Sequence, residues 1–337
     1  MAGSMTRLIG AASLCVGMVA SGAALAAAAP GQRAFPTADH APSADPYPDR
    51  VTHFPSGVTG LADVVYSVVP GYRPMILDIY MPPKGKAAAA KPLVIYVHGG
   101  GWVAGHTRAA GALSDFPKVL ASLAAEGFVV ASVEYRFSAE ARFPAQLDDM
   151  RAAIRFLKGN AGKYGIDPTR VGIWGGSAGG HLAALAALSC AAPGFDAKPQ
   201  PIGSECVQAA AIWYGVFDFA PIVARAEGSP IALIGCADAA SCPADRVRAV
   251  SPLTYLDPGD PPFLLIHGEN DHTVSVTQST NAYAKMKAAG VQVDEILIPG
   301  VDHSFIGKTP AETHAATMRA VNATFDFFHA QLKQPAR

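Results

Sequence analysis

The stretch Val171-Gly172-Ile173-Trp174-Gly175-Gly176-Ser177-Ala178-Gly179-Gly180-His181-Leu182-Ala183 joins a β-branched apolar run, clustered glycines around one serine, and the start of an Ala/Leu-rich run. This order predicts a strand, a tight turn and a helix. Gly175-x-Ser177-x-Gly179 is the pattern of a nucleophile elbow, in which a strained turn raises the serine hydroxyl above a sheet. A glycine-rich turn without chemistry also fits, since the pattern occurs by chance. The rest of the chain has to decide between the two interpretations.

The first 28 residues have the pattern of a secretory signal peptide. Arg7 supplies a short positive region, an apolar run extends from Leu8 to Ala24, and Ala24-Leu25-Ala26 offers a small-x-small cleavage site, with further candidates through Ala29. The apolar run is shorter than the roughly 20 residues that span a bilayer, and no later stretch qualifies as a transmembrane helix. We therefore expect an exported protein, secreted or periplasmic, without a membrane span.

Composition divides the remaining chain into a leader and one domain. Residues 29–56 are rich in Pro, Ala, Asp and Ser, which predicts a flexible leader, and residues 57–337 are expected to form a single catalytic domain. Half of the chain is hydrophobic, so a large core is possible. The formal net charge of −1 offers no electrostatic footprint for nucleic acid or for an anionic membrane. The oligomeric state cannot be deduced from the sequence.

Four cysteines remain once the signal peptide and its Cys15 are removed. They are Cys190, Cys206, Cys236 and Cys242, an even number in a chain expected in an oxidising compartment. Two disulfides are the natural interpretation, and four cysteines allow three pairings. Proximity in sequence favours Cys190 with Cys206 and Cys236 with Cys242. A metal site is the alternative, but no CxxC spacing or nearby pair of histidines supports it.

Strand-like and helix-like runs alternate along the domain. Apolar β-branched runs predict strands at 63–69, 75–80, 92–97, 128–133, 171–176, 207–214, 262–268 and 291–298. Amphipathic runs predict helices at 113–126, 143–159 and 276–289, besides the one behind Ser177. This alternation predicts an α/β fold with a mostly parallel central sheet and helices on both faces. The less regular region 215–252 is expected to be a small insert or lid.

A second glycine cluster follows the predicted strand at 92–97. In His98-Gly99-Gly100-Gly101-Trp102, adjacent glycines allow several backbone N–H groups to point at one spot. We expect the amides of Gly100, Gly101 and Ala178 to form an oxyanion hole, with the Trp102 amide as an alternative donor. The other interpretations are a flexible loop or a phosphate cradle. A P-loop would need a Lys-Ser/Thr pair that is absent here.

A serine nucleophile needs a base within hydrogen-bonding reach and a carboxylate that holds the base in the right tautomer. The candidates are Ser177, Asp271 and His303, each of which follows a predicted strand. Glu269 and Asp294 are alternative acids, but Glu269 follows its strand too closely and Asp294 lies within the next one. The sequence therefore predicts a Ser-His-Asp triad.

Four aromatic residues near the expected site are candidates for a substrate pocket. They are Trp102, Trp213, Tyr214 and Phe217. Each one follows or overlaps the end of a strand where ligands bind in α/β sheets. Ordinary core packing is an equally good explanation for any one of them.

Several segments together resemble a known family. They are Leu77-Asp78-Ile79-Tyr80-Met81-Pro82, His98 to Trp102, Glu134-Tyr135-Arg136, Phe143-Pro144-Ala145-Gln146, and Trp174 to Ala183. With the order Ser-Asp-His, they resemble the α/β-hydrolase esterases with an HGGGW oxyanion loop. The similarity is closest to the carbohydrate-esterase branch, which includes acetylxylan and feruloyl esterases, and extends to hormone-sensitive-lipase-like carboxylesterases. Lipase-like members usually carry Asp before the serine, where this chain has Gly176.

The resemblance implies an α/β-hydrolase fold and a carboxylic ester hydrolase that works through an acyl-enzyme without a cofactor or metal. The expected partner is a small-molecule or polysaccharide ester, such as an acetyl or feruloyl ester. An amide hydrolase of the formamidase or exopeptidase type would share the triad. A non-catalytic binding protein on the same fold is a further alternative, since fold does not determine function.

Overall fold

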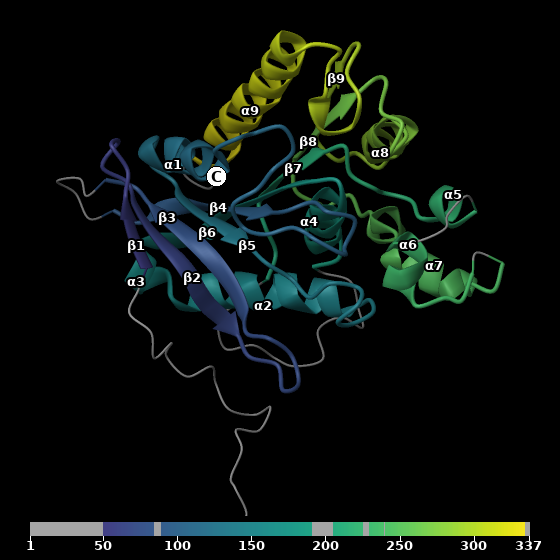
Figure 1. Cartoon of the computed structure of the whole chain (residues 1–337), viewed down its shortest axis with the longest axis horizontal. Coiled ribbons are helices and arrows are strands. Elements are labelled where there is room, and N and C mark those ends of the chain that lie inside the picture. Colours follow the sequence, from purple (N-terminus) through teal and green to yellow (C-terminus); the bar gives the residue numbers. More distant parts are fainter. Residues whose placement is uncertain (1–49, 84–88, 191–204, 225–228, 239, 334–337) are drawn as a thin grey trace, which may run out of the picture. The chain divides into compact units, whose positions relative to one another are not determined.

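The structure, a computed structural model, describes residues 50–83, 89–190, 205–224, 229–238 and 240–333. In this part of the chain, nine strands form one sheet in the order β1-β2-β3-β5-β4-β6-β7-β8-β9 (Figure 1). The strands are β1 (Arg50–His53), β2 (Thr59–Ser67), β3 (Met75–Met81), β4 (Lys91–Val97), β5 (Val129–Val133), β6 (Ile166–Gly176), β7 (Ala209–Trp213), β8 (Phe263–Gly268) and β9 (Val293–Ile298). All neighbouring pairs from β5 to β9 are parallel, and those from β1 to β5 are antiparallel. The predicted mostly parallel α/β sheet is confirmed.

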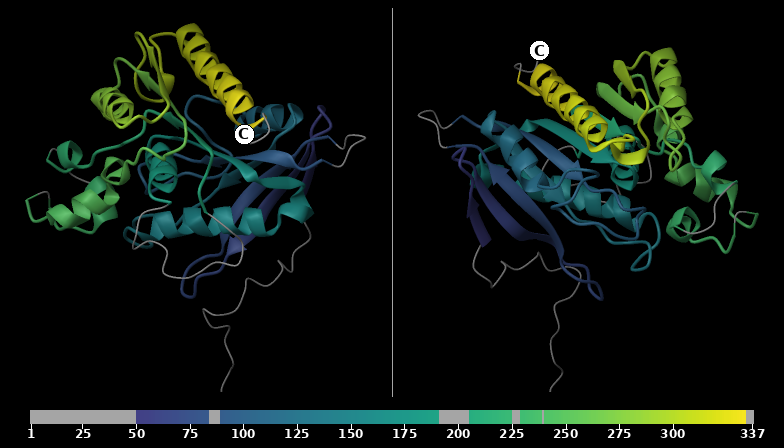
Figure 2. Two further views of the ribbon diagram at one scale, coloured as in Figure 1. Left: turned by 180° about the vertical axis from the view of Figure 1, so that it is seen from behind. Right: turned by 45° about the horizontal axis from the view of Figure 1, so that its top comes forward.

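The helices that connect these strands lie on both faces of the sheet. They are α1 (Phe116–Ala125), α2 (Ala145–Gly159), α3 (Ala161–Tyr164), α4 (Ala178–Leu188), α5 (Ala220–Val223), α6 (Ser229–Ile234), α7 (Ala244–Val250), α8 (Thr277–Ala288) and α9 (Pro310–Leu332), with the short 3₁₀ helices η1 (Pro252–Tyr255) and η2 (His303–Phe305). Figures 1 and 2 show α1 and α9 on one side of the sheet and α2 on the other. No helix in the described ranges is long and apolar enough to cross a membrane.

Strand β4 shows why the sheet needs two helical layers. Its residues Leu93, Ile95 and Val97 pack in the core with α2, α4 and α8, while Val94 and Tyr96 pack in the core with α1 and α9. Side chains of a strand alternate between its two faces, so a continuous apolar run must be buried on both. Helix α4 is buried along its whole length, which explains its Ala- and Leu-rich sequence without a polar face.

The ordered structure begins earlier than the sequence predicts. Strand β1 lies inside the stretch 29–56 that was expected to be a flexible leader, and it pairs antiparallel with β2. All four residues of β1 are exposed, so no apolar pattern marks the strand in the sequence. As the edge strand of the sheet, it is held by backbone hydrogen bonds to β2. The predicted signal peptide at 1–28 and the first part of the predicted leader lie outside the described residues.

Both disulfides favoured by sequence proximity are present in the structure. Cys190 is bonded to Cys206 and Cys236 to Cys242, over sequence separations of 16 and 6 residues. The first bridge joins the end of α4 to the segment that leads into β7, and the second closes a loop between α6 and α7.

Reduction of these bridges is expected to lower the free energy of unfolding, because the unfolded chain regains the freedom of two closed loops. Loop lengths of this size correspond to about 3 kcal/mol for the first bridge and about 2 kcal/mol for the second. Thermal denaturation with and without reductant measures the effect, and replacing each cysteine pair by alanine separates the two contributions. Four titratable thiols per folded chain in the absence of reductant would contradict the prediction.

Candidate active site

Ser177 sits in the turn between β6 and α4 with backbone angles φ 56° and ψ −123°, a region that a residue with a side chain rarely adopts. Its amide donates a hydrogen bond of 3.0 Å to the carbonyl of Trp213 on β7. Neighbouring backbone atoms leave no room for a side chain at the flanking glycines. A Cβ on Gly175 would lie 2.4 Å from the carbonyl oxygen of Gly179, and one on Gly179 would lie 2.1 Å from that of Val97. The local packing thus explains the G-x-S-x-G pattern.

The fold brings Ser177, His303 and Asp271 together from three separate loops. His303 Nε2 lies 3.0 Å from the hydroxyl of Ser177, and His303 Nδ1 lies 2.7 Å from Oδ2 of Asp271. Asp271 follows β8, and His303 begins η2 after β9. An ionised carboxylate only accepts, so Nδ1 carries the proton and Nε2 can accept one from the serine. This is the geometry of a nucleophile, a general base and an orienting acid.

The carboxylate of Asp271 is surrounded by donors. Oδ1 accepts from the amides of Thr273 at 2.9 Å and Val274 at 2.8 Å, and Oδ2 also lies 3.2 Å from Nε2 of His267. Burial alone would raise the pKa of Asp271. The hydrogen bonds from His267 and His303, the charge of His303 and the Val274 amide outweigh burial and hold the pKa well below its usual range. Asp271 therefore stays ionised.

The two alternative acids lie elsewhere. Glu269 and Asp294 are both exposed, and neither is hydrogen-bonded to His303. Asp294 belongs to β9, where it pairs in register with Leu264 of β8. Of the three candidate acids, Asp271 alone contacts the imidazole.

The loop that carries His303 is held by Asp302, which the sequence did not single out, and by the candidate pocket residue Tyr214. Oδ1 of Asp302 accepts from the His303 amide at 2.6 Å and from the His272 amide at 2.9 Å. The ring of Tyr214 packs against the imidazole of His303 with a centroid distance of 4.7 Å. The Tyr214 hydroxyl is hydrogen-bonded to Ser304, and burial raises the pKa of this phenol well above its ordinary value. These contacts orient the imidazole toward Ser177.

The predicted oxyanion loop adopts a conformation that only glycine takes up easily. Gly100 and Gly101 have φ angles of 119° and 60°, and a Cβ on Gly100 would lie 2.1 Å from the carbonyl oxygen of Ala104. The amides of Gly100, Gly101 and Ala178 donate no hydrogen bond within the described ranges of the chain. Both glycines line the same cavity as Ser177, and Ala178 begins α4 directly behind the serine. These amides are available to an oxyanion.

A cavity of about 460 Å³ opens above the serine. Small residues line most of it, and the tyrosines are its largest members. The lining residues are Tyr96, Gly99, Gly100, Gly101, Gly105, Ala109, Ala110, Gly111, Gly176, Ser177, Tyr214, Thr273, His303 and Ser304. None of the described residues of the insert at 215–252 lines it. The oxyanion loop, the elbow and the His303 loop enclose it instead.

The aromatic residues predicted for the pocket are mostly structural. Tyr214 lines the cavity, but Trp102, Trp213 and Phe217 do not. The indole N–H of Trp102 donates to Nδ1 of His181 on α4 at 3.1 Å, and that of Trp213 donates to a threonine of α9. Phe217 is fully buried in the core. The two indole N–H groups find partners inside the protein, as buried indoles require. Trp102, Trp213 and Phe217 are therefore core residues, which corrects the prediction.

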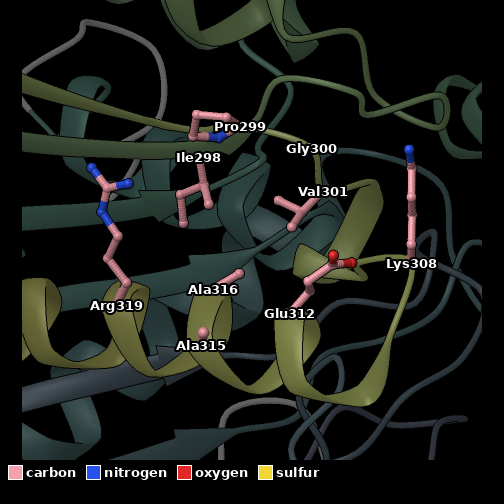
Figure 3. A pocket seen from close by; sticks show the side chains of 9 residues that line it. All are labelled: Ile298, Pro299, Gly300, Val301, Lys308, Glu312, Ala315, Ala316 and Arg319. Atoms are coloured by element: carbon pink, nitrogen blue, oxygen red, sulfur yellow. The ribbon is translucent and has the colours of Figure 1, made fainter.

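Two other cavities of the described structure have no histidine in their lining. A second cavity of about 410 Å³ lies between the end of β9 and α9, with Lys308, Glu312 and Arg319 around it (Figure 3). The Glu312 carboxylate already caps α9 by accepting from the Thr309 amide at 3.1 Å. No group of three or more His, Cys, Asp or Glu side chains in the described ranges is placed to hold a metal ion.

The chain is similar to known esterases. The BD-FAE family model matches residues 77–286. Esterase LipQ of Mycobacterium tuberculosis is 32% identical over 72% of this chain and 57% of its own length. Ethyl acetate hydrolase of Pseudomonas putida is 33% identical over 68% of this chain and 70% of its own length. The chain spans little more than half the length of LipQ and of two further mycobacterial esterases, LipM and LipC.

Solved structures show the same architecture. A truncated form of a carbohydrate esterase from gut microbiota superposes with a TM-score of 0.67 at 29% identity, covering 84% of this chain and 99% of that one. The matched family region contains β4, the oxyanion loop, the elbow and Asp271, while His303 lies beyond it.

Proposed function

Because the chain belongs to the BD-FAE family of α/β-hydrolase esterases, we propose that it is a serine carboxylic ester hydrolase with Ser177, His303 and Asp271 as its triad. The observation that carries the proposal is the continuous hydrogen-bonded line from Ser177 through His303 to Asp271, beside backbone amides that have no partner in the described structure. Core packing gives no reason to place a strained serine, an imidazole and a buried carboxylate in one line.

In this mechanism the hydroxyl oxygen of Ser177 attacks the ester carbonyl while Nε2 of His303 takes its proton. Asp271 holds the imidazole in the required tautomer and stabilises the imidazolium. The amides of Gly100, Gly101 and Ala178 donate to the oxyanion of the tetrahedral intermediate. The imidazolium then protonates the leaving alcohol, and an acyl group remains on the serine. Water then attacks the acyl-enzyme while Nε2 of His303 takes its proton. His303 returns this proton to the oxygen of Ser177, and the acid is released.

We propose short-chain acyl or aromatic esters, of the acetyl or feruloyl type, as substrates. The cavity is lined mainly by glycine and alanine and is narrowed by Tyr96 and Tyr214. Such a lining leaves room for a small acyl group or a flat ring. The names of the relatives, ethyl acetate hydrolase and carbohydrate esterase, are compatible with small acyl groups.

We also propose that the protein is exported, to the periplasm or beyond. The sequence pattern of residues 1–28 supports this, and the two disulfides suit an oxidising compartment.

An amide hydrolase with the same triad is the second candidate function.

A chain-length series tests the proposal. Hydrolysis of p-nitrophenyl esters from acetyl to octanoyl is expected to show the highest kcat/KM at the short end, with a fall of about tenfold or more toward octanoyl as the acyl group outgrows the cavity. Matched p-nitroanilides serve as controls and should react more slowly. Faster anilide than ester cleavage would favour the amide hydrolase, and no turnover of any ester would favour a binding protein.

A further inference from the structure

A second histidine, His267, contacts the carboxylate of the triad. It lies near the end of β8 and is fully buried. Its Nε2 is 2.9 Å from the carbonyl oxygen of Val274 and 3.2 Å from Oδ2 of Asp271. Both of these oxygens are acceptors, since Asp271 is ionised. The hydrogen-bond partners therefore assign the proton to Nε2, which shares it between the two oxygens.

The other ring nitrogen of His267 is also engaged. Nδ1 lies 2.7 Å from the hydroxyl of Ser279, a buried residue of α8. This hydroxyl can donate to Nδ1, which completes the Nε2–H tautomer. With hydrogen bonds at both nitrogens, the ring cannot rotate without breaking two contacts in a buried site, which is costly.

Oδ2 of Asp271 consequently faces two imidazoles, His303 at 2.7 Å and His267 at 3.2 Å. We propose that His267 is a positioning residue, which keeps Oδ2 of Asp271 in line with Nδ1 of His303 and spreads part of its negative charge. The inference rests on the proposed function, because it assigns a task within the triad. His267 does not touch the reacting atoms.

The backbone amides of Thr273 and Val274 hold only the other oxygen, Oδ1. Because the carboxylate is rigid, a rotation about its Cβ–Cγ bond moves both oxygens together. Without His267, fewer contacts resist this rotation, which would move Oδ2 out of line with Nδ1 of His303. The imidazole would then lose the partner that selects its tautomer, and fewer molecules would have Nε2 free to accept the serine proton.

Two substitutions distinguish the effect of losing the hydrogen-bond donor of His267 from the effect of changing the volume of its side chain. His267→Gln can place an amide N–H where Nε2 lies, and His267→Leu fills similar space without any donor. We expect His267→Leu to lower kcat for p-nitrophenyl acetate by about 10- to 100-fold with KM changed by less than about threefold, and His267→Gln to stay within about fivefold of the native kcat. Ile266→Val is the matched control, since Ile266 is buried on the opposite face of β8. It should lower Tm slightly and leave kcat unchanged.

Proton NMR in water supplies a readout that needs no substrate. The His303 Nδ1 proton held by Asp271 is expected at low field, to shift or broaden in His267→Leu, and to stay in place in Ile266→Val. An unchanged kcat and an unchanged resonance in His267→Leu would overturn the inference. The inference would also be overturned if His267→Leu and His267→Gln lost kcat equally and in proportion to their losses of Tm. If the native protein hydrolyses no ester but the resonance responds as expected, the proposed function fails and the positioning contact stands.

Discussion

Replacing Ser177 by alanine is expected to lower kcat for ester hydrolysis by about five to six orders of magnitude. The hydroxyl that His303 would activate is lost, and no other hydroxyl is hydrogen-bonded to this imidazole in the described structure. Some rate above the uncatalysed reaction should persist, because the oxyanion amides and the cavity remain. The strained backbone at φ 56° stays compatible with folding, since alanine adds no bulk.

The measurement compares kcat and KM of the native protein and Ser177→Ala on p-nitrophenyl acetate, with the Tm of both. Ser122→Ala is a matched control, because Ser122 is exposed on α1 and its hydroxyl bonds only to the Lys118 carbonyl. It should leave kcat unchanged. A Ser177→Ala variant that retained native kcat would place the nucleophile elsewhere and refute the proposed function.

Replacing Asp271 by asparagine is expected to lower kcat by about four orders of magnitude with little change in structure. An amide at this position presents N–H to Nδ1 of His303, which favours the tautomer with its proton on Nε2. That nitrogen then cannot accept the proton of Ser177. The surrounding donors, two backbone amides and His267, were arranged for a carboxylate, so the variant should also lose some stability.

Asp294→Asn is the control for this variant, because Asp294 is the alternative acid and lies exposed on β9. We expect it to keep native kcat and native Tm. Glu269→Gln provides a second control of the same kind. If either control lost activity while Asp271→Asn retained it, the assignment of the acid would be wrong.

The sequence predicted the sheet well where residues carry a periodic pattern. The strands at the centre are rich in apolar residues. Strand β4 lies close to where it was expected, whereas β6 begins at Ile166 rather than at residue 171. Strand β1 was not predicted, because its four residues are all exposed and it is held by backbone pairing with β2 and by the ion pair of Arg50 with Asp63. Backbone pairing leaves no trace in side-chain chemistry.

Functional residues, too, could be predicted where their local conformation restricts the residue type. Ser177 and the loop at Gly100 and Gly101 stand out because the required backbone conformations admit few residue types. His267 did not stand out, although its spacing of four residues from Asp271 was visible at the end of a predicted strand. Trp102 and Trp213 were misjudged, because a sequence does not reveal that a buried indole has an internal partner.

The amino-acid sequence by itself determined the alternation of strands and helices, the strained turn at Ser177, and the chain order of serine, acid and histidine, because each depends on short-range sterics and hydrophobic periodicity. Tertiary structure alone decided that a second histidine shares the carboxylate of Asp271, and which aromatic residues meet the cavity. Those outcomes depend on how β7, β8 and β9 lie side by side, which brings residues more than 100 positions apart to a distance of 3.0 Å. Distances of this kind arise only when the whole sheet has formed.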